Sequence, residues 1–162
     1  MIETEAPLLS RLLPDAEATA ALARDLAPRL RAGDVLLLEG DLGAGKSSFA
    51  RALIRALPGP AGEDRSGEEV PSPTFTLVQI YERRPAAVWH FDLYRLSDPE
   101  EVYELGWEEA LGGALLLVEW PERLGRLAPP EALRLRLAIE GEGRRAALEG
   151  PAPWARRLAG LA

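Results

Sequence analysis

The sequence predicts an α/β fold of one domain over residues 1–162, built on a mixed β-sheet with helices on both faces. Two aliphatic runs, Val35–Leu38 and Leu115–Glu119, are typical of buried parallel strands. Helical segments separate the predicted strands in the first part of the chain, which favours a sheet that is parallel at its centre. A period-two segment, Leu133–Ile139, precedes a glycine turn and indicates antiparallel strands at an edge.

The first part of the chain predicts a helix, a strand and a second helix. The first helix runs from Leu13 to about Leu30, because a proline and an aspartate at its start suit the first turn and the positive end of the helix dipole. Val35–Leu38 follows as the strand. Ser47–Leu57 predicts the second helix, with its apolar residues at helical spacing.

The middle of the chain predicts a long loop and two strands, and the last part predicts short helices and a hairpin. The loop Pro58–Pro73 is rich in glycine, proline and charge, and its stretch from Pro58 to Val70 is long enough to suggest a role. The remaining elements are strands at Thr74–Tyr81 and Ala86–Asp92, a helix from the N-cap Asp98 to about Leu105 that resumes at Trp107–Leu111, the strand Leu115–Glu119, a short helix at Pro121–Leu127, a hairpin of Leu133–Ile139 and Arg144–Leu148, and a final short helix carrying Trp154 and Leu158.

Composition excludes several classes of function. The net charge of −7 disfavours direct binding of nucleic acid, whose affinity rests on neutralising phosphates. The chain has no cysteine, which excludes disulfides and thiolate chemistry. No apolar run approaches the roughly 20 residues of a membrane helix, and the acidic N-terminus is unlike a signal peptide. We therefore expect a cytoplasmic protein that does not bind a membrane.

Lys46 is the only lysine in a chain with 19 basic residues. It lies in Gly40–Ser47, which matches G-x-x-x-x-G-K-[ST] between a predicted strand and a predicted helix. Glycines let backbone amides approach phosphates, the helix N-terminus attracts anions, lysine reaches the β- and γ-phosphates, and the next hydroxyl binds Mg²⁺. We therefore predict a nucleotide-phosphate site with Ser47 as a metal ligand. Its nucleotide-binding residues are Asp41, Leu42, Gly43, Ala44, Gly45, Lys46, Ser47 and Ser48.

Two predicted strands end in a carboxylate, which a phosphate-loop enzyme needs to hold Mg²⁺ or to order water. Glu119 follows four aliphatic residues, and Asp92 ends the strand that starts at Ala86. Each alone is as readily a solvated charge at a strand end. Because ligands of open α/β sheets bind at the carboxyl ends of strands, the presence of both favours catalysis.

Four further side chains carry two interpretations each. Thr74, within Ser72–Thr76, is a candidate sensor of the γ-phosphate, although the residues alone slightly favour an ordinary strand start. His90, the sole histidine, favours a structural role, and Trp120 favours packing. Arg95 is a weak candidate for an arginine finger, because arginine is abundant throughout the chain.

Four sequence blocks together resemble the bacterial TsaE (YjeE) family of P-loop ATPases. They are Gly40–Phe49 (GDLGAGKSSF), Ser72–Val78 (SPTFTLV), His90–Leu96 (HFDLYRL) and Val118–Glu122 (VEWPE). The resemblance extends from about Leu12 to near Leu148, which is most of the chain. One difference is Ser47, where the family usually has threonine; both hydroxyls can bind Mg²⁺.

The resemblance implies an ATPase of tRNA threonylcarbamoyladenosine synthesis that uses ATP and Mg²⁺. It implies TsaB- and TsaD-like partner subunits, which contact the tRNA and which the ATPase resets between turnovers. By matching block to block, Ser47 and Glu119 become metal ligands, and Asp92 lies near the γ-phosphate or the attacking water. The catalytic residues would then be Lys46, Asp92 and Glu119, and the further nucleotide-site residues would be Thr74, Trp120 and Arg144.

Two other functions remain open from the residues. A small-molecule kinase would use the same loop with an acceptor pocket and a basic lid, for which Arg83–Arg84 is the one compact cluster. A nucleotide-bound assembly switch would bind nucleotide with little turnover. Acceptor-dependent ADP formation would indicate the first, and binding without turnover the second.

Overall fold

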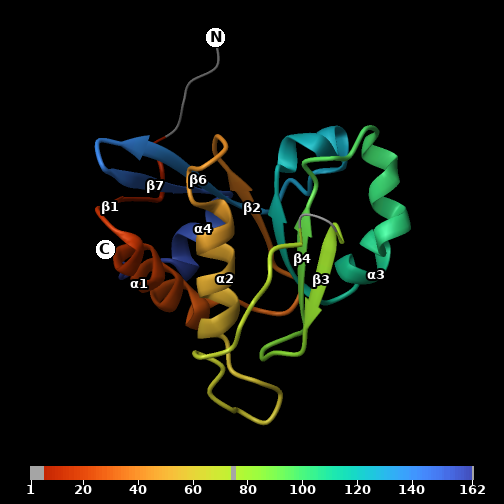
Figure 1. The fold of residues 1–162 in the computed structure, drawn as a ribbon, viewed down its shortest axis with the longest axis horizontal. Coiled ribbons are helices and arrows are strands. Elements are labelled where there is room, and N and C mark those ends of the chain that lie inside the picture. The colour runs from red at the N-terminus through yellow and green to blue at the C-terminus, as the bar shows by residue number, and fades with distance from the viewer. Residues whose placement is uncertain (1–5, 74–75, 162) are drawn as a thin grey trace.

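The computed structural model describes residues 6–73 and 76–161, and a single mixed β-sheet forms its centre (Figure 1). The sheet has seven strands in the order β1-β7-β6-β2-β5-β4-β3. The strands are β1 Leu9–Leu13, β2 Val35–Glu39, β3 Val78–Tyr81, β4 Val88–Asp92, β5 Leu115–Glu119, β6 Leu133–Glu140 and β7 Gly143–Glu149.

Four neighbouring strands at the centre are parallel, and both edges are antiparallel. Strand β2 pairs in parallel with β5 and with β6, and β4 pairs in parallel with β5. At one edge β3 is antiparallel to β4; at the other, β7 is antiparallel to β6 and β1 to β7. The predicted mixed sheet is confirmed, with antiparallel strands at two edges.

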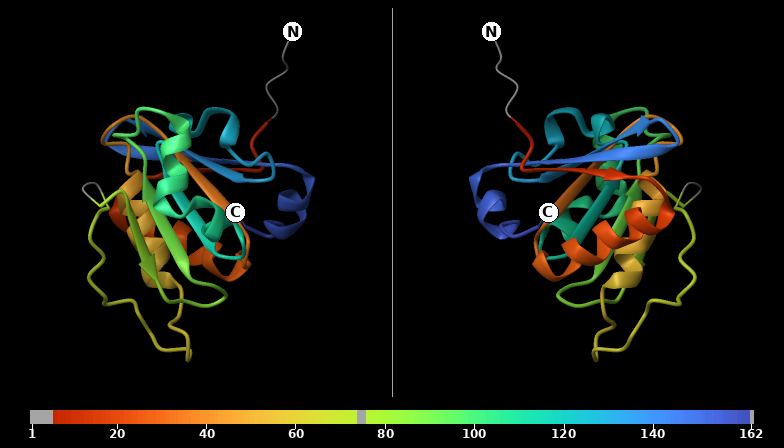
Figure 2. Two further views of the ribbon diagram at one scale, coloured as in Figure 1. Left: turned by 90° about the vertical axis from the view of Figure 1, so that its right-hand side faces the viewer. Right: turned by 90° about the vertical axis from the view of Figure 1, so that its left-hand side faces the viewer.

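The helices cover both faces of the sheet, as predicted (Figure 2). Alternate residues of β2 show why: Leu36 and Leu38 pack with α1, α2 and α4, whereas Val35 and Leu37 pack with η2, α3 and η3. No helix among the described residues is long and apolar enough to cross a membrane. The helices are α1 Ala16–Leu26, the 3-10 turn η1 Ala27–Arg29, α2 Lys46–Ala56, the 3-10 helix η2 Pro99–Leu105, α3 Trp107–Leu111, the 3-10 helix η3 Pro121–Leu127 and α4 Ala152–Arg157.

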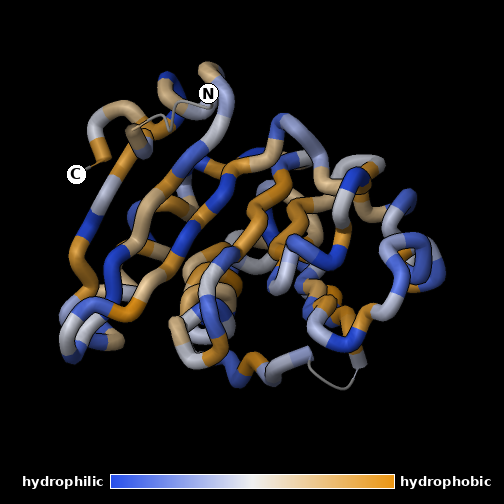
Figure 3. The backbone as a smooth tube through the Cα atoms, turned by 90° about the horizontal axis from the view of Figure 1, so that it is seen from above, coloured by the Kyte–Doolittle hydropathy of each residue, from blue (hydrophilic) through white to orange (hydrophobic). Residues whose placement is uncertain are grey.

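The hairpin β6–β7 shows the predicted period of two along its first strand (Figure 3). Leu133, Leu135 and Leu137 are buried. The intervening Arg134 and Arg136 both pair with Glu39 at the end of β2, at 2.5 and 3.2 Å. These ion pairs connect the hairpin to the strand that enters the glycine loop.

The N-terminal strand β1 was not predicted, and it displaces the start of the first helix. Only Leu9 and Leu13 of β1 are buried, so the strand shows no clear alternation. The predicted helix from Leu13 begins at Ala16 because β1 uses the chain as far as Leu13. Asp15 is its N-cap and accepts a hydrogen bond of 2.9 Å from the amide of Ala18.

Two other predicted elements differ in extent or kind. The strand predicted from Thr74 begins at Val78, after Leu77 adopts a positive φ of 67°; residues 74 and 75 lie outside the described part of the chain. The helix predicted after Asp98 forms as a 3-10 helix, with Asp98 accepting from the amide of Glu100 at 2.9 Å. Its end coincides with a left-handed glycine at position 106.

Candidate active site

The glycine loop joins β2 to α2 at the edge where the parallel strands end. Gly45, with φ of 105°, is the N-cap of α2, so the first amides of the helix face the loop. Gly40 has φ of 150°, and a Cβ there would lie 2.5 Å from the carbonyl oxygen of Leu137. Both positions therefore require glycine. The loop presents a helix N-terminus at the sheet edge, which is a ready anion site.

A cavity of about 380 Å³ opens beside this loop. It collects residues from three segments that are far apart in the sequence: the loop with the start of α2, the residues that end and follow β4, and those that end and follow β5. The lining residues are Leu42, Gly43, Gly45, Lys46, Ser47, Ser48, Asp92, Tyr94, Arg95, Glu119 and Trp120. Most of the predicted site residues thus surround one cavity.

Glu119 is the most tightly held of these side chains, with 2% of its surface exposed. Its Oε1 accepts a hydrogen bond of 2.7 Å from the Ser47 hydroxyl, and its Oε2 lies 2.7 Å from His90 Nε2. Burial acts to raise the pKa of Glu119, but the contact with His90, the Ser47 hydroxyl and the charge of Lys46 hold that pKa below its usual range. The lowered pKa favours the ionised carboxyl, which can only accept hydrogen bonds, so His90 Nε2 is the donor in this contact.

Lys46 is buried, and its ammonium lies among acceptors at the mouth of the loop. Nζ donates to the carbonyl oxygens of Gly40 and, at 3.1 Å, of Asp41. It also lies 3.8 Å from the centre of the Trp120 ring. Burial lowers the pKa of Lys46, and the charges of Glu119 and nearby acids only partly offset this effect. The ammonium is poorly hydrated, so it gains much from an anion in the loop.

Asp92 ends β4 directly beside Glu119, because the two residues are partners in the parallel register. Its side chain is also buried, with 6% exposed. Its Oδ1 accepts a hydrogen bond of 3.1 Å from the amide of Tyr94. The two predicted carboxylates therefore lie side by side on the cavity wall.

Trp120 follows Glu119 in a left-handed conformation, with φ of 58°. This backbone turns the indole onto the cavity wall, where it covers the Lys46 ammonium. The Tyr94 ring packs against it with 4.9 Å between centroids. The packing interpretation of Trp120 is therefore incomplete: the ring packs, but against the loop lysine.

The structure places the remaining predicted residues around the loop or outside the described ranges. Arg144 of β7 donates from Nη2 to the carbonyl oxygen of Gly43 at 3.0 Å but does not line the cavity. Asp41 and Ala44 line an adjoining hollow that shares Trp120 with the main cavity. Thr74 lies outside the described residues, so its sensor role stays a prediction.

Sequence reasoning missed how His90 and Tyr94 contribute. His90 is fully buried on β4, two residues before Asp92, so both side chains lie on the face that meets α2. That spacing was a usable signal, but only the pairing of β4 with β5 brings His90 to Glu119. Arg95, the candidate arginine finger, lines the cavity.

The donor set suits a hard divalent cation only in part. Among the described residues no group of three or more histidine, cysteine or acidic side chains could hold a metal ion. Ser47 and Glu119 instead offer two adjacent oxygen ligands. Mg²⁺ is commonly bound in this way, by one or two side chains together with water and substrate phosphates.

Comparison with known proteins shows the family to which the chain is similar. Residues 13–147 match the model of the family "Threonylcarbamoyl adenosine biosynthesis protein TsaE". The TsaE protein of Rickettsia felis is 43% identical over 134 residues, which cover 83% of this chain and 75% of that protein. TsaE of Bacillus subtilis is 37% identical over 130 residues, or 80% of this chain and 77% of that protein.

A solved structure has the same fold. The crystal structure of Bacillus subtilis YdiB superposes with a TM-score of 0.71 at 26% sequence identity. The match covers 93% of this chain and 90% of that one. The similarity therefore extends over most of both chains.

Proposed function

This chain belongs to the TsaE family, and from that premise we propose that it is the ATP-hydrolysing subunit of the tRNA threonylcarbamoyladenosine machinery. One observation carries the proposal. At the mouth of a phosphate-binding loop, a buried glutamate is held by the loop serine on one oxygen and by His90 on the other, at 2.7 Å each. A carboxylate held in this way would be positioned to bind the metal of a bound nucleotide.

The loop would bind the phosphates of ATP through the amides that begin α2 and through Lys46. A phosphate oxygen would replace the carbonyl acceptors of Gly40 and Asp41 that Lys46 Nζ contacts. Ser47 and Glu119 would hold Mg²⁺, which when bound neutralises charge on the β- and γ-phosphates. Their fit to a metal that also uses phosphate oxygens supports this assignment.

Asp92 would orient the attacking water. Its carboxylate lies beside Glu119 but lacks the contacts to Ser47 and His90 that hold its neighbour. The Tyr94 amide orients its Oδ1, and the side chain lines the cavity. Trp120 would keep Lys46 in place and exclude water from the ammonium.

The acidity of the chain supports a division of labour in the assembly. With a net charge of −7, this subunit is a poor ligand for tRNA. We propose that TsaB- and TsaD-like subunits contact the tRNA and transfer threonylcarbamoyl to the adenosine next to the anticodon. This chain would reset their complex between turnovers, in the cytoplasm, with weak ATPase activity when alone.

The kinase alternative requires a basic lid, and the contacts of Arg83 and Arg84 do not support that role. Arg83 is 6% exposed, and its guanidinium is bonded to the carbonyl oxygens of Ile54 and Glu82 and to the Glu68 carboxylate. Arg84 lines a different hollow, at the far end of α2. Neither side chain is placed to act as a lid over the phosphate loop.

Release of ADP from ATP tests the proposal. We expect slow release by the chain alone and faster release when both partner subunits and tRNA are present. ADP formation that depends on a small-molecule acceptor would instead identify a kinase. Tight nucleotide binding without turnover, even with the partners, would identify an assembly switch.

A further inference from the structure

A second hollow, of about 900 Å³, lies at the end of α2 opposite the phosphate loop. Since α2 has 11 residues at about 1.5 Å of rise each, roughly 16 Å separates the two ends. Aliphatic and proline side chains, such as Leu30, Leu57 and Pro85, form part of its lining. Three arginines also line it: Arg24, Arg55 and Arg84. We call this hollow the arginine groove.

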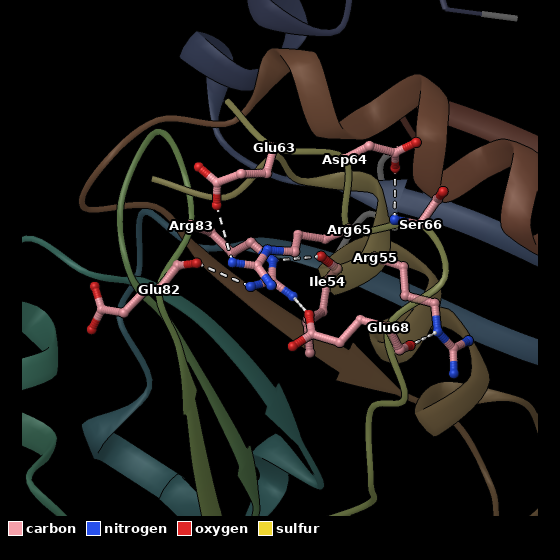
Figure 4. A network of polar contacts seen from close by, with 9 residues as sticks. All are labelled: Ile54, Arg55, Glu63, Asp64, Arg65, Ser66, Glu68, Glu82 and Arg83. Atoms are coloured by element: carbon pink, nitrogen blue, oxygen red, sulfur yellow. Dashed lines mark hydrogen bonds and ion pairs between the residues drawn. The ribbon is translucent and has the colours of Figure 1, made fainter. Parts of the chain in front are cut away.

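The long loop after α2 forms one wall of the arginine groove, and polar contacts fix that wall (Figure 4). The buried Arg83 donates to the carbonyl oxygen of Ile54 at 3.0 Å and pairs with Glu68 of the loop. Arg55 Nε donates to the carbonyl oxygen of Glu68 at 2.8 Å. The amide of Arg84 donates to the carbonyl oxygen of Pro58 at 2.9 Å. The loop therefore has a defined shape that keeps the groove open.

The charge of the groove opposes that of the chain as a whole. Its lining has three arginines and one acidic residue, Asp64, whereas the chain carries a net charge of −7. The guanidinium of Arg84 forms no hydrogen bond or ion pair with any of the described residues. Arg55 donates from Nε to the loop, and its two terminal nitrogens form no hydrogen bond or ion pair within residues 6–73 and 76–161. Guanidinium groups of this kind bind carboxylates in bidentate pairs.

We propose that the arginine groove binds an extended acidic segment of a partner protein, one that places an apolar side chain between carboxylates. The apolar lining accepts the side chain, and the arginines accept the carboxylates around it. A volume near 900 Å³ is at the upper end of the range of about 300–1,000 Å³ for ligand pockets and suits a few residues of peptide. In naming that partner as a subunit of the tRNA-modifying assembly, the inference rests on the proposed function.

A photo-crosslinker at Ser66 tests the occupant directly. Ser66 is exposed and lines the groove, and its replacement by benzoylphenylalanine leaves all three arginines in place. The substituted chain is mixed with the two partner subunits, irradiated, and its adducts are mapped by mass spectrometry. We expect one adduct to a partner segment rich in aspartate and glutamate with an apolar residue. An adduct to a second copy of this chain, to a basic or neutral segment, or to nothing overturns the proposal.

Charge reversal gives the second measurement, with a matched control. Arg24 lines the groove and pairs with Glu17, and Arg126 on η3 pairs with Glu100; both pairs are exposed. We expect Arg24→Glu together with Arg84→Glu to raise the Kd for the partner subunits about tenfold, mostly through slower, salt-sensitive association. Arg126→Glu should leave that Kd within about twofold.

The same preparations separate failure of this inference from failure of the proposed function. If the double variant binds the partners as tightly as the unsubstituted chain, the groove assignment is wrong even where partner-stimulated ADP release persists. If the unsubstituted chain shows no partner-stimulated ADP release, the proposed function is wrong, and the crosslink then reports only whether the groove holds an acidic segment. Retained ADP release by the double variant alone shows that its fold and phosphate loop are intact.

Discussion

The ends of β4 and β5 lie side by side, and each carries a carboxylate, but the two carboxylates have different contacts. Asp92 and Glu119 are partners in the register, and both are buried. Glu119 has both carboxylate oxygens engaged, by Ser47 and by His90. Asp92 has a contact from the amide of Tyr94 on one oxygen. Glu119 is thus held from two elements, and the Tyr94 amide orients Asp92 at the end of its own strand.

We propose a division of roles between the two strand ends, in which Glu119 holds the metal and Asp92 orients the attacking water. A metal ligand must stay ionised and fixed, and Glu119 has a lowered pKa and two side-chain partners. A carboxylate that orients water needs lone pairs directed at the reacting atoms. The loop lysine serves both ends, since Lys46 is within electrostatic reach of Glu119 and of Asp92.

The largest effect on ATP binding is expected at Lys46, whose charge acts on both Glu119 and Asp92. Lys46→Ala should abolish ATP binding, because the loop then lacks the charge that reaches the β- and γ-phosphates. Lys46→Arg should fail nearly as badly, since a planar guanidinium does not replace a compact ammonium. Isothermal titration with ATP measures both, and thermal unfolding provides the control for folding. Undiminished ATP turnover by Lys46→Ala contradicts the site assignment.

Removing Glu119, the proposed metal ligand, should have the second-largest effect. Glu119→Gln should lower ATP hydrolysis by roughly 10²–10³-fold, a loss typical of a group that stabilises transition-state charge. Nucleotide binding measured without Mg²⁺ should change little. Glu122→Gln is the matched control, because Glu122 is a nearby acid that also acts on Lys46. An unchanged magnesium requirement in Glu119→Gln would move the metal role to Asp92.

Asp92→Asn should distinguish the role of Asp92 from that of Glu119. We expect hydrolysis to fall by about 10²-fold, as for loss of a group that handles the proton of the attacking water. The Mg²⁺ concentration for half-maximal activity should stay within about twofold, because Glu119 and Ser47 remain. If that concentration rises more in Asp92→Asn than in Glu119→Gln, the assignment of the two carboxylates is reversed.

His90 should affect magnesium affinity without touching the nucleotide. His90→Phe removes the hydrogen bond to Glu119 Oε2 and should weaken apparent Mg²⁺ affinity by about 10–100-fold, as for other partners of metal ligands. His90→Gln can still donate to Glu119 and should restore much of that affinity. Competition with a magnesium indicator in the presence of ADP measures it. Equal Mg²⁺ affinity in His90→Phe and the unsubstituted chain would leave His90 with packing alone.

The smallest effect is on stability against acid. The folded-state pKa of Glu119 lies below its ordinary 4.5, so its ionised form stabilises the fold fully above that pH. This contribution is lost as pH falls through the folded-state value. The free energy of unfolding in urea should be measured for the unsubstituted chain and for Glu119→Gln at several pH values. The difference between the two should be constant above about pH 5, and toward about pH 3 the unsubstituted chain should lose stability relative to Glu119→Gln. A difference independent of pH contradicts the lowered pKa.

Two strands of the parallel centre, β2 and β5, were predictable because they are aliphatic on both faces. The period of two in β6 predicted an edge strand, but β6 lies between β2 and β7 and is parallel to β2. Val35–Leu38 and Leu115–Val118 are continuous apolar runs; the first leads through Glu39 into the glycine loop, and the second is followed by Glu119. The carboxyl ends of parallel strands meet at one edge, so the convergence of Asp92 and Glu119 followed from topology. The edge strand β1 was harder to predict from the sequence. β1 has two buried residues with polar or exposed ones between them, a pattern that its pairing with β7 explains and its sequence does not.

The partners of the site residues were less predictable than the residues themselves. The contact between His90 and Glu119 depends on the relative register of β4 and β5, which no local pattern specifies. Trp120 covers Lys46 because its backbone is left-handed, a conformation uncommon for tryptophan. The 3-10 form of η2 likewise depends on packing, since its N-cap and proline suit an α-helix equally well.

Repeated modification of tRNA tests the central claim most directly. The two partner subunits, tRNA in excess over protein, and the threonylcarbamoyl donor are incubated with the unsubstituted chain or with Glu119→Gln, and modified adenosine is counted against protein. We predict many turnovers with the unsubstituted chain and ATP, and about one or fewer with Glu119→Gln or with a non-hydrolysable ATP analogue. Multiple turnovers under either of those last two conditions would contradict a role for ATP hydrolysis at this site.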